Sequence, residues 1–270
     1  MKKLLILCLF SVFICGCTST AKHENKNNLT KTDVIKNATF NGNAEAQYNL
    51  GILYYKGEEV PKDYGMSFDW FLKAAQQNLA KAQYSVGQMY MQGLGTDKDY
   101  KKAFDWFLKS ATNGYASAQY NIGVFYEKGK GVEQDYKQAL YWYTKAAQQD
   151  ITYAQNNLAG LYFLGKGTAR DYDKAYELTK ESAGHGNIDA QSNMGRLYYL
   201  GKGVAKDDKK AFYWASKAAE QGVADAQYML ALFYNQGIGV EKNINKAKEW
   251  LDKSKKNTRK NPQIPQTVFY

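Results

Sequence analysis

The sequence contains few cysteines, histidines and prolines, and the scarcity of cysteine and histidine excludes several kinds of site. Among 270 residues there are three cysteines, two histidines and three prolines. All three cysteines lie within the first 17 residues, so the rest of the chain can form no disulfide bond and no cysteine-based metal or catalytic site. Two histidines leave little for a metal centre. With 44% apolar and 15% aromatic residues, the chain can nevertheless build a core.

The first 17 residues have the pattern of an export signal. A short basic segment, Met1 to Lys3, precedes an apolar run over residues 4–14 that is too short to span a bilayer. The sequence Ile14-Cys15-Gly16-Cys17 resembles the bacterial lipobox, and the resemblance implies a lipoprotein signal peptide over residues 1–16 and lipidation of Cys17. Because Thr18 is not aspartate, it also implies an outer-membrane anchor in the bacterial cell envelope, facing the periplasm. An ordinary signal peptide, with Cys17 as a free thiol, is the alternative.

Most of the chain consists of six copies of one sequence repeat. The period is 36 residues throughout and gives units at 43–78, 79–114, 115–150, 151–186, 187–222 and 223–258. Three equivalent positions, which we call columns, are nearly invariant among the units. The first is alanine (Ala46, Ala82, Ala118, Ala154, Ala190 and Ala226) and the second is tyrosine (Tyr54, Tyr90, Tyr126, Tyr162, Tyr198 and Tyr234). The third is tryptophan (Trp70, Trp106, Trp142, Trp214 and Trp250), with Leu178 in the fourth unit.

Each unit predicts two helices. In the first half, apolar residues recur at helical spacing and end at a glycine such as Gly57, which can close a helix in the left-handed conformation. The second half begins at Asp63 or its equivalent, whose side chain can accept from the free amides of a helix start. It closes at residues that tolerate positive φ, including Asn78 and Asp150.

These columns resemble the Sel1-like repeat, a relative of the tetratricopeptide repeat. The resemblance implies an all-α fold, a right-handed α-solenoid of six helix-turn-helix repeats. Residues 30–42 match the second half of a unit and predict an N-terminal capping helix. The polar residues 17–29 predict a lipidated flexible tether, and the basic, proline-containing residues 259–270 predict an extended tail.

The positive charge lies mainly at the ends of the chain. The formal charge is +10, but residues 43–251 carry 25 basic and 23 acidic side chains. Such a nearly neutral body does not provide the continuous basic groove that phosphate binding requires, so no nucleic-acid partner is expected.

No catalytic constellation is evident. His23 lies in the tether, and His185 shares its column with Gln77, Asn113, Gln149 and Gln221, which indicates an exposed corner between repeats. The Ser-x-x-Lys signature of some β-lactamases occurs only at residues 19–22. We therefore expect no enzyme, no cofactor and no metal; a hydrolase acting on β-lactams or peptidoglycan is the least favoured alternative.

The first helix of each unit supplies the candidate binding surface. By resemblance to tetratricopeptide repeats, positions equivalent to Glu45, Tyr48, Ile52 and Tyr55 face the concave side. The Ile52 column is chemically diverse, whereas the neighbouring Leu53 column stays apolar, so only the second has a uniform packing role. The candidate partner-binding residues are Tyr48, Ile52, Tyr55, Tyr84, Gln88, Met91, Tyr120, Val124, Asn156, Phe163, Arg196, Tyr199, Asp225 and Tyr228. The alternative is that the tyrosines merely cover the core.

Three functions remain after these exclusions. The favoured one is a monomeric, membrane-anchored periplasmic scaffold or adaptor that binds a protein or peptide partner on its concave face. The second is an immunity or inhibitor protein that neutralises a toxin or hydrolase delivered to the periplasm. The third is the hydrolase named above.

Overall fold

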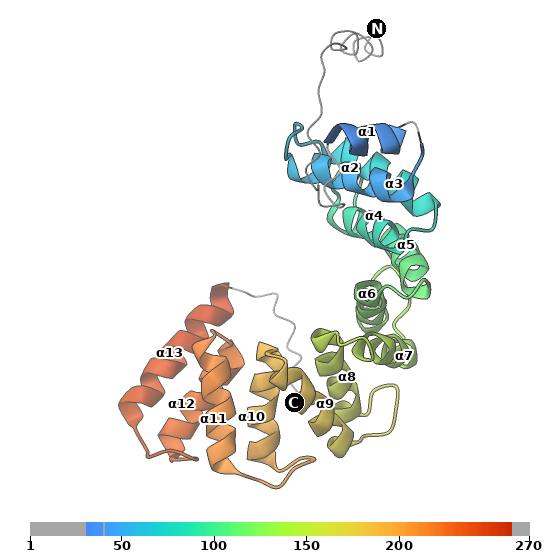
Figure 1. The fold of residues 1–270 in the computed structure, drawn as a ribbon. Coiled ribbons are helices and arrows are strands. Elements are labelled where there is room, and N and C mark those ends of the chain that lie inside the picture. The colour runs from blue at the N-terminus through green and yellow to red at the C-terminus, as the bar shows by residue number, and fades with distance from the viewer. Residues whose placement is uncertain (1–30, 40, 261–270) are drawn as a thin grey trace, which may run out of the picture.

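The computed structural model describes residues 31–39 and 41–260, and every regular element within them is a helix (Figure 1). The helices are α1 (Lys31–Thr39), α2 (Ala44–Lys56), α3 (Tyr64–Gln76), α4 (Ala80–Gln92), α5 (Tyr100–Thr112), α6 (Ala116–Lys128), α7 (Tyr136–Ala147), α8 (Thr152–Leu164), α9 (Tyr172–Gly184), α10 (Ile188–Leu200), α11 (Asp208–Glu220), α12 (Ala224–Gln236) and α13 (Ile244–Lys260). The expected signal peptide and tether, and residues 261–270 of the expected tail, lie outside the described residues.

Six helical hairpins follow α1 and stack into one curved solenoid (Figure 1). Each even-numbered helix from α2 to α12 pairs with the helix after it, and each hairpin packs on the next. We call the even-numbered helices the A helices and their partners, α3 to α13, the B helices. The all-α solenoid expected from the sequence is confirmed.

The turns between helices follow the capping residues. Gly57 adopts φ 75° at the end of α2, and the glycines that end α4, α6, α8, α10 and α12 are left-handed in the same way. The Asp63 carboxylate accepts from the Met66 amide at 3.0 Å at the start of α3. Asn78 and Asp150 have φ of 63° and 60° after α3 and α7. Local residue chemistry therefore fixes where each hairpin turns.

Close contact between A and B helices depends on small residues. In the first three repeats a glycine of the A helix faces a ring of the B helix, and a Cβ on Gly51 would lie 2.6 Å from the Phe71 ring. The period alanines, such as Ala82 and Ala118, are fully buried. The core is thus a line of similar small clusters running through the stack.

Both ends of the stack are helical. Ala38 of α1 is buried beside Ala46, Leu50 and Trp70, so α1 covers the first hairpin as the predicted capping helix would. At the other end α13 includes residues 259 and 260, which corrects the expectation of an extended tail from residue 259. The helix can continue to that point because the next proline along the chain is Pro262, which disfavours helix only from the residue before it.

Candidate functional site

The candidate partner-binding residues all lie on A helices. Those on α2 are Tyr48, Ile52 and Tyr55, on α4 Tyr84, Gln88 and Met91, on α6 Tyr120 and Val124, on α8 Asn156 and Phe163, on α10 Arg196 and Tyr199, and on α12 Asp225 and Tyr228. Repetition every 36 residues places them in register along the stack. We call the surface formed by the exposed members of this set, together with the side chains beside them on the same side of the stack, the concave surface.

A row of tyrosines occupies the concave surface from the first repeat to the fourth. It consists of Tyr48, Tyr84, Tyr115, Tyr120 and Tyr153, and we call it the tyrosine row. Three of these rings lie on a B-helix ring beneath them, with centroid distances of 5.3 Å for Tyr48 and Phe71, 5.4 Å for Tyr84 and Phe107, and 5.9 Å for Tyr120 and Tyr143. Tyr115 lies 5.1 Å from Tyr84, and Tyr153 lies 6.3 Å from Tyr120.

Electrostatic coupling shows that alternate repeats face a common space. Burial raises the pKa of Tyr120, and the carboxylates of Glu127 and Asp189 add to the shift although Asp189 lies two repeats further on. Burial likewise raises the pKa of Tyr115, with a further contribution from Tyr48 in the first repeat. Groups two repeats apart approach each other most closely on the inner side of a curved stack. These contributions support the placement of the tyrosine row on that side.

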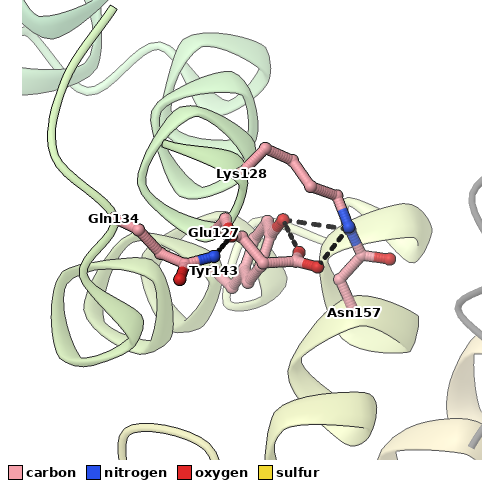
Figure 2. A network of polar contacts seen from close by, with 5 residues as sticks. All are labelled: Glu127, Lys128, Gln134, Tyr143 and Asn157. Carbon is pink, nitrogen blue, oxygen red and sulfur yellow. Dashed lines mark hydrogen bonds and ion pairs between the residues drawn. The ribbon is translucent and has the colours of Figure 1, made fainter. Parts of the chain in front are cut away.

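A polar network centred on the buried Tyr143 joins α6, α7 and α8 at the middle of the solenoid (Figure 2). The Tyr143 hydroxyl donates to Glu127 Oε2 at 2.6 Å and accepts from Asn157 Nδ2 at 3.1 Å. Lys128 Nζ lies 2.7 Å from Glu127 Oε1, and Gln134 Nε2 donates to the Glu127 carbonyl at 2.7 Å. Burial and the Glu127 carboxylate raise the pKa of Tyr143 well above its usual value. The network fixes the floor beneath Tyr120.

The sequence pattern alone did not single out this network. Glu127 shares the column of Tyr55 and is its only carboxylate, and Tyr143 is the only phenol in the column of Phe71. These two departures from columns that are mostly apolar or aromatic were the available signal. What the sequence could not show is that the two columns meet, with Asn157 of the next repeat beside them.

Two candidate residues are corrected because the structure buries them. Asn156 is 4% exposed, and its Oδ1 accepts from Asn193 Nδ2 at 2.9 Å. Phe163 is 7% exposed and packs on Tyr172, with ring centroids 5.1 Å apart. Asn156 is too short to project as a tyrosine would, and a phenylalanine at position 163 is stabilised by apolar contact. Neither offers surface to a partner.

The remaining candidates keep some exposure, and their role in binding stays a prediction. Tyr228 is 58% exposed, and Tyr55 is also exposed. Asp189, equivalent to Glu45 and expected with it on the concave side, is half-buried; burial raises its pKa, and the Asp225 carboxylate adds to the shift. The early repeats thus present mainly tyrosines, whereas the later ones present carboxylates beside Tyr228.

We also searched the described helices for metal centres and membrane-spanning segments. Within residues 31–39 and 41–260, no group of three or more His, Cys, Asp or Glu side chains could hold a metal ion. No helix in that part of the chain is long and apolar enough to cross a bilayer.

Comparison with known proteins gives a family and several structural relatives. The Sel1 repeat pattern matches residues 44–79, 80–115, 116–151, 152–187, 188–223 and 224–257. The crystal structure of c5321, a protective antigen of uropathogenic Escherichia coli, is 34% identical with a TM-score of 0.77 over 85% of this chain and 49% of that protein, so this chain spans about half of its length.

Two further structures show how far the likeness extends. A Sel1 repeat protein from Oxalobacter formigenes is 32% identical with a TM-score of 0.74, over 83% of this chain and 90% of that one. The immunity protein PA5088 from Pseudomonas aeruginosa is 20% identical with a TM-score of 0.49, over 83% and 85%, which is too distant to carry a functional argument. A search among curated proteins found no match. The six matched repeats and the closely superposable solenoids show that this chain belongs to the Sel1 repeat family.

Proposed function

We propose that this chain is a binding scaffold that holds a protein or peptide partner on its concave surface. The observation that carries the proposal is the tyrosine row, in which partly buried rings line the inner side of the stack. A tyrosine held by a ring beneath it loses little conformational freedom on binding and still presents a large face and a hydroxyl, which suits it as an anchor. Tyr153 is 58% exposed and so presents much of its ring to a partner.

The partner would contact two chemically different parts of the concave surface. The tyrosine row supplies aromatic contacts, with Lys81 stacked 4.6 Å from the centre of the Tyr48 ring and paired with Glu45. Beyond Tyr153 the concave surface offers Asp189, Asp225 and Tyr228 instead. An extended segment crossing both parts would have its direction set by this asymmetry, because the tyrosines are concentrated at one end and the carboxylates of Asp189 and Asp225 lie at the other.

The test is affinity capture with variants matched for residue type. Tyr120→Ala combined with Tyr153→Ala should abolish or strongly reduce capture of any specific partner. The control pair is Tyr141→Ala with Tyr213→Ala, on the B helices α7 and α11, where the side chains are 50% and 57% exposed. If the control pair lost the partner and the concave pair kept it, the concave surface would not be the binding site.

The captured partner also separates a scaffold from an inhibitor. A toxin or hydrolase whose activity falls when it is bound would identify an immunity or inhibitor role. A partner whose activity is unchanged while it is held at the envelope would identify an adaptor.

We further propose that a lipid on Cys17 anchors the protein in the outer membrane of the cell envelope, with the protein facing the periplasm. The support is the lipobox-like sequence and the residue that follows it. Several acyl chains together hold a protein at a membrane far more firmly than one. Cys17→Ala should move the protein from the membrane fraction to the soluble fraction, and membrane retention of that variant would contradict the anchor.

A further inference from the structure

A repeated side-chain hydrogen bond joins the end of a B helix to the A helix of the same repeat. In five of the six repeats an amide nitrogen at the B-helix end donates to a buried glutamine thirty residues earlier. The donor and acceptor pairs are Gln77 and Gln47 at 2.7 Å, Asn113 and Gln83 at 3.0 Å, Gln149 and Gln119 at 2.8 Å, Gln221 and Gln191 at 2.8 Å, and Asn257 and Gln227 at 3.0 Å. We call these bonds the latches.

The fourth repeat has the acceptor but a different donor. Gln155 occupies the acceptor column and is 1% exposed, yet its Oε1 is buried without a hydrogen-bond partner among the described residues. The residue in the donor column is His185, at the end of α9. A buried carbonyl oxygen without a donor is costly to the folded state, so this acceptor strongly favours any donor that can reach it.

His185 is placed to be that donor. Its backbone has φ −80° and ψ 9°, and the equivalent Asn113 has φ −78° and ψ 12°, so the two side chains leave the helix in the same direction. Histidine Nδ1 and asparagine Nδ2 are separated from their Cα by the same number of bonds. Nδ1 of His185 can therefore take the place from which Asn113 Nδ2 reaches its glutamine.

We propose that His185 is a proton-controlled latch whose Nδ1–H donates to Gln155 Oε1. An amide donates at every pH, whereas a neutral imidazole carries a proton on only one of its two nitrogens. The protonated ring donates from both nitrogens, and its hydrogen bond is charge-assisted and hence stronger. The fourth latch is firm when His185 is charged and weakens as the pH rises and the ring loses its second proton, whereas the other five do not respond.

The surrounding elements set the charges that a protonated His185 would meet. Helix α8 carries no acidic or basic side chain, and α9 carries Lys180 and Glu181 in the turn before His185. The turn before α8 ends in Asp150, whose equivalents Gly42 and Gly114 accept a second bond from Gln77 and Gln149 through their carbonyls. Helix α10 carries Arg196 and Asp189, and Asp189 is coupled to Asp225 and Tyr120 on the concave surface.

The position of this latch gives it a structural consequence. The fourth hairpin lies in the middle of the stack, and it also has Leu178 and Thr179 where other repeats have tryptophan and, in the first three, a buried ring. This hairpin therefore has no aromatic side chain at either position, and loosening the end of α9 should affect its packing more than in the other hairpins. It lies between the tyrosine row and the later, acidic part of the concave surface. The latch would respond to pH whatever that surface binds.

Nitrogen-15 NMR and hydrogen exchange on the full chain, purified in detergent, test the latch directly. His23→Gln leaves His185 as the only histidine, so its two ring nitrogens can be assigned without ambiguity. At pH 5.5 we expect the Nδ1–H proton of His185 to exchange slowly with solvent and to lie close enough to the Gln155 side chain to give an NOE. Between pH 8 and pH 5.5 the protection factors of the Gly186 and Asn187 amides, which bond the Ala183 and Ser182 carbonyls at 3.1 Å, should rise about fivefold after correction for intrinsic exchange.

Two replacements at position 185 and one transplant make the test specific. His185→Asn should give high protection at both pH values, and His185→Ala should give low protection at both. Asn113→His should transfer the pH response to the Gly114 and Tyr115 amides. The proposal is overturned if the protection in the parent chain does not change with pH, if His185→Ala retains the pH response, or if Nδ1 exchanges freely at pH 5.5, as it would with Gln155 bonded only to water.

Discussion

The first three repeats and the last three form the same helical hairpin, but different side chains fill the space between the two helices. In repeats one to three a buried ring sits on a glycine, and a Cβ on Gly87 would lie 2.7 Å from the Phe107 ring. In the later repeats the ring column holds Thr179, Ala215 and Leu251. In the fifth, a Cβ on Gly195 would instead meet the Ala215 backbone at 3.1 Å, so there the helices themselves approach closely. The hairpin is preserved by complementary pairs and not by one fixed residue.

The same difference reaches the concave surface. Where a ring fills the gap between helices, the A-helix tyrosine above it is supported and remains partly exposed. In repeats four and five, which lack the ring, the equivalent positions hold Asn156 and Ser192, and both are buried. Repeat six has Leu251 in the ring column and keeps the exposed Tyr228. The aromatic part of the candidate site thus depends on the packing beneath it, so changes in the core of the first three repeats should alter the surface as well.

Removing a supporting ring should have the largest effect. Phe107→Ala should lower the free energy of unfolding by about 3–5 kcal/mol, because the ring is fully buried and leaves a cavity. Thr179→Ala, at the equivalent position of the fourth repeat, should cost about 1 kcal/mol, since the Thr179 hydroxyl bonds only the Ala175 carbonyl of its own helix. Chemical denaturation followed by circular dichroism measures both. Equal costs would show that the two halves do not differ in how their gaps are filled.

Filling a glycine should cost less, and the cost should depend on the ring. Gly87→Ala should destabilise by about 1–3 kcal/mol because the new methyl group overlaps the Phe107 ring. In a Phe107→Thr background, which reproduces the Ala159 and Thr179 pair of repeat four, that penalty should largely vanish. The control is Gly184→Ala, where a Cβ meets nothing within 4 Å, and it should be neutral or slightly stabilising. A double-mutant cycle without coupling would refute the complementary-pair explanation.

Tyr143→Phe would make repeat three resemble repeats one and two. Loss of the hydroxyl removes a donor from Glu127 and an acceptor from Asn157, so we expect a cost of about 1–2 kcal/mol at neutral pH. Because the folded-state pKa of Tyr143 is raised, its stabilisation is complete below the ordinary tyrosine pKa and is lost as the pH rises above it. The free energy of unfolding measured from pH 8 to pH 11 should therefore fall less steeply in the variant. An unchanged slope would contradict the buried network.

Asp189→Asn should produce the smallest change, and in the opposite direction. Burial and Asp225 raise the pKa of Asp189, so its charged form opposes folding once the pH rises through that folded-state pKa. The variant should be more stable at pH 7 by less than about 1 kcal/mol, with the gain disappearing below pH 4. Thermal unfolding at the two pH values measures it, and a destabilised variant at pH 7 would show that a partner within the chain compensates the charge.

The features that follow from neighbouring residues and from the period were predictable from the sequence. Gly57, Asp63 and Asn78 carry their conformational preferences locally, so the helix ends follow from residue type and spacing alone. The contacts across the stack do not follow in this way. The bond from Asn193 to Asn156 joins residues 37 apart, and the unpaired Gln155 is visible only when compared with its five equivalents. The solenoid and capping helix were therefore predictable, whereas the polar network and the burial of two candidate residues were not.

Hydrogen–deuterium exchange of the protein with and without its captured partner tests binding at the concave surface. We predict new protection concentrated in α4, α6 and α8, which carry the centre of the tyrosine row, with smaller changes in α10 and α12. Protection confined to the B helices, with α4, α6 and α8 unchanged, would contradict binding there.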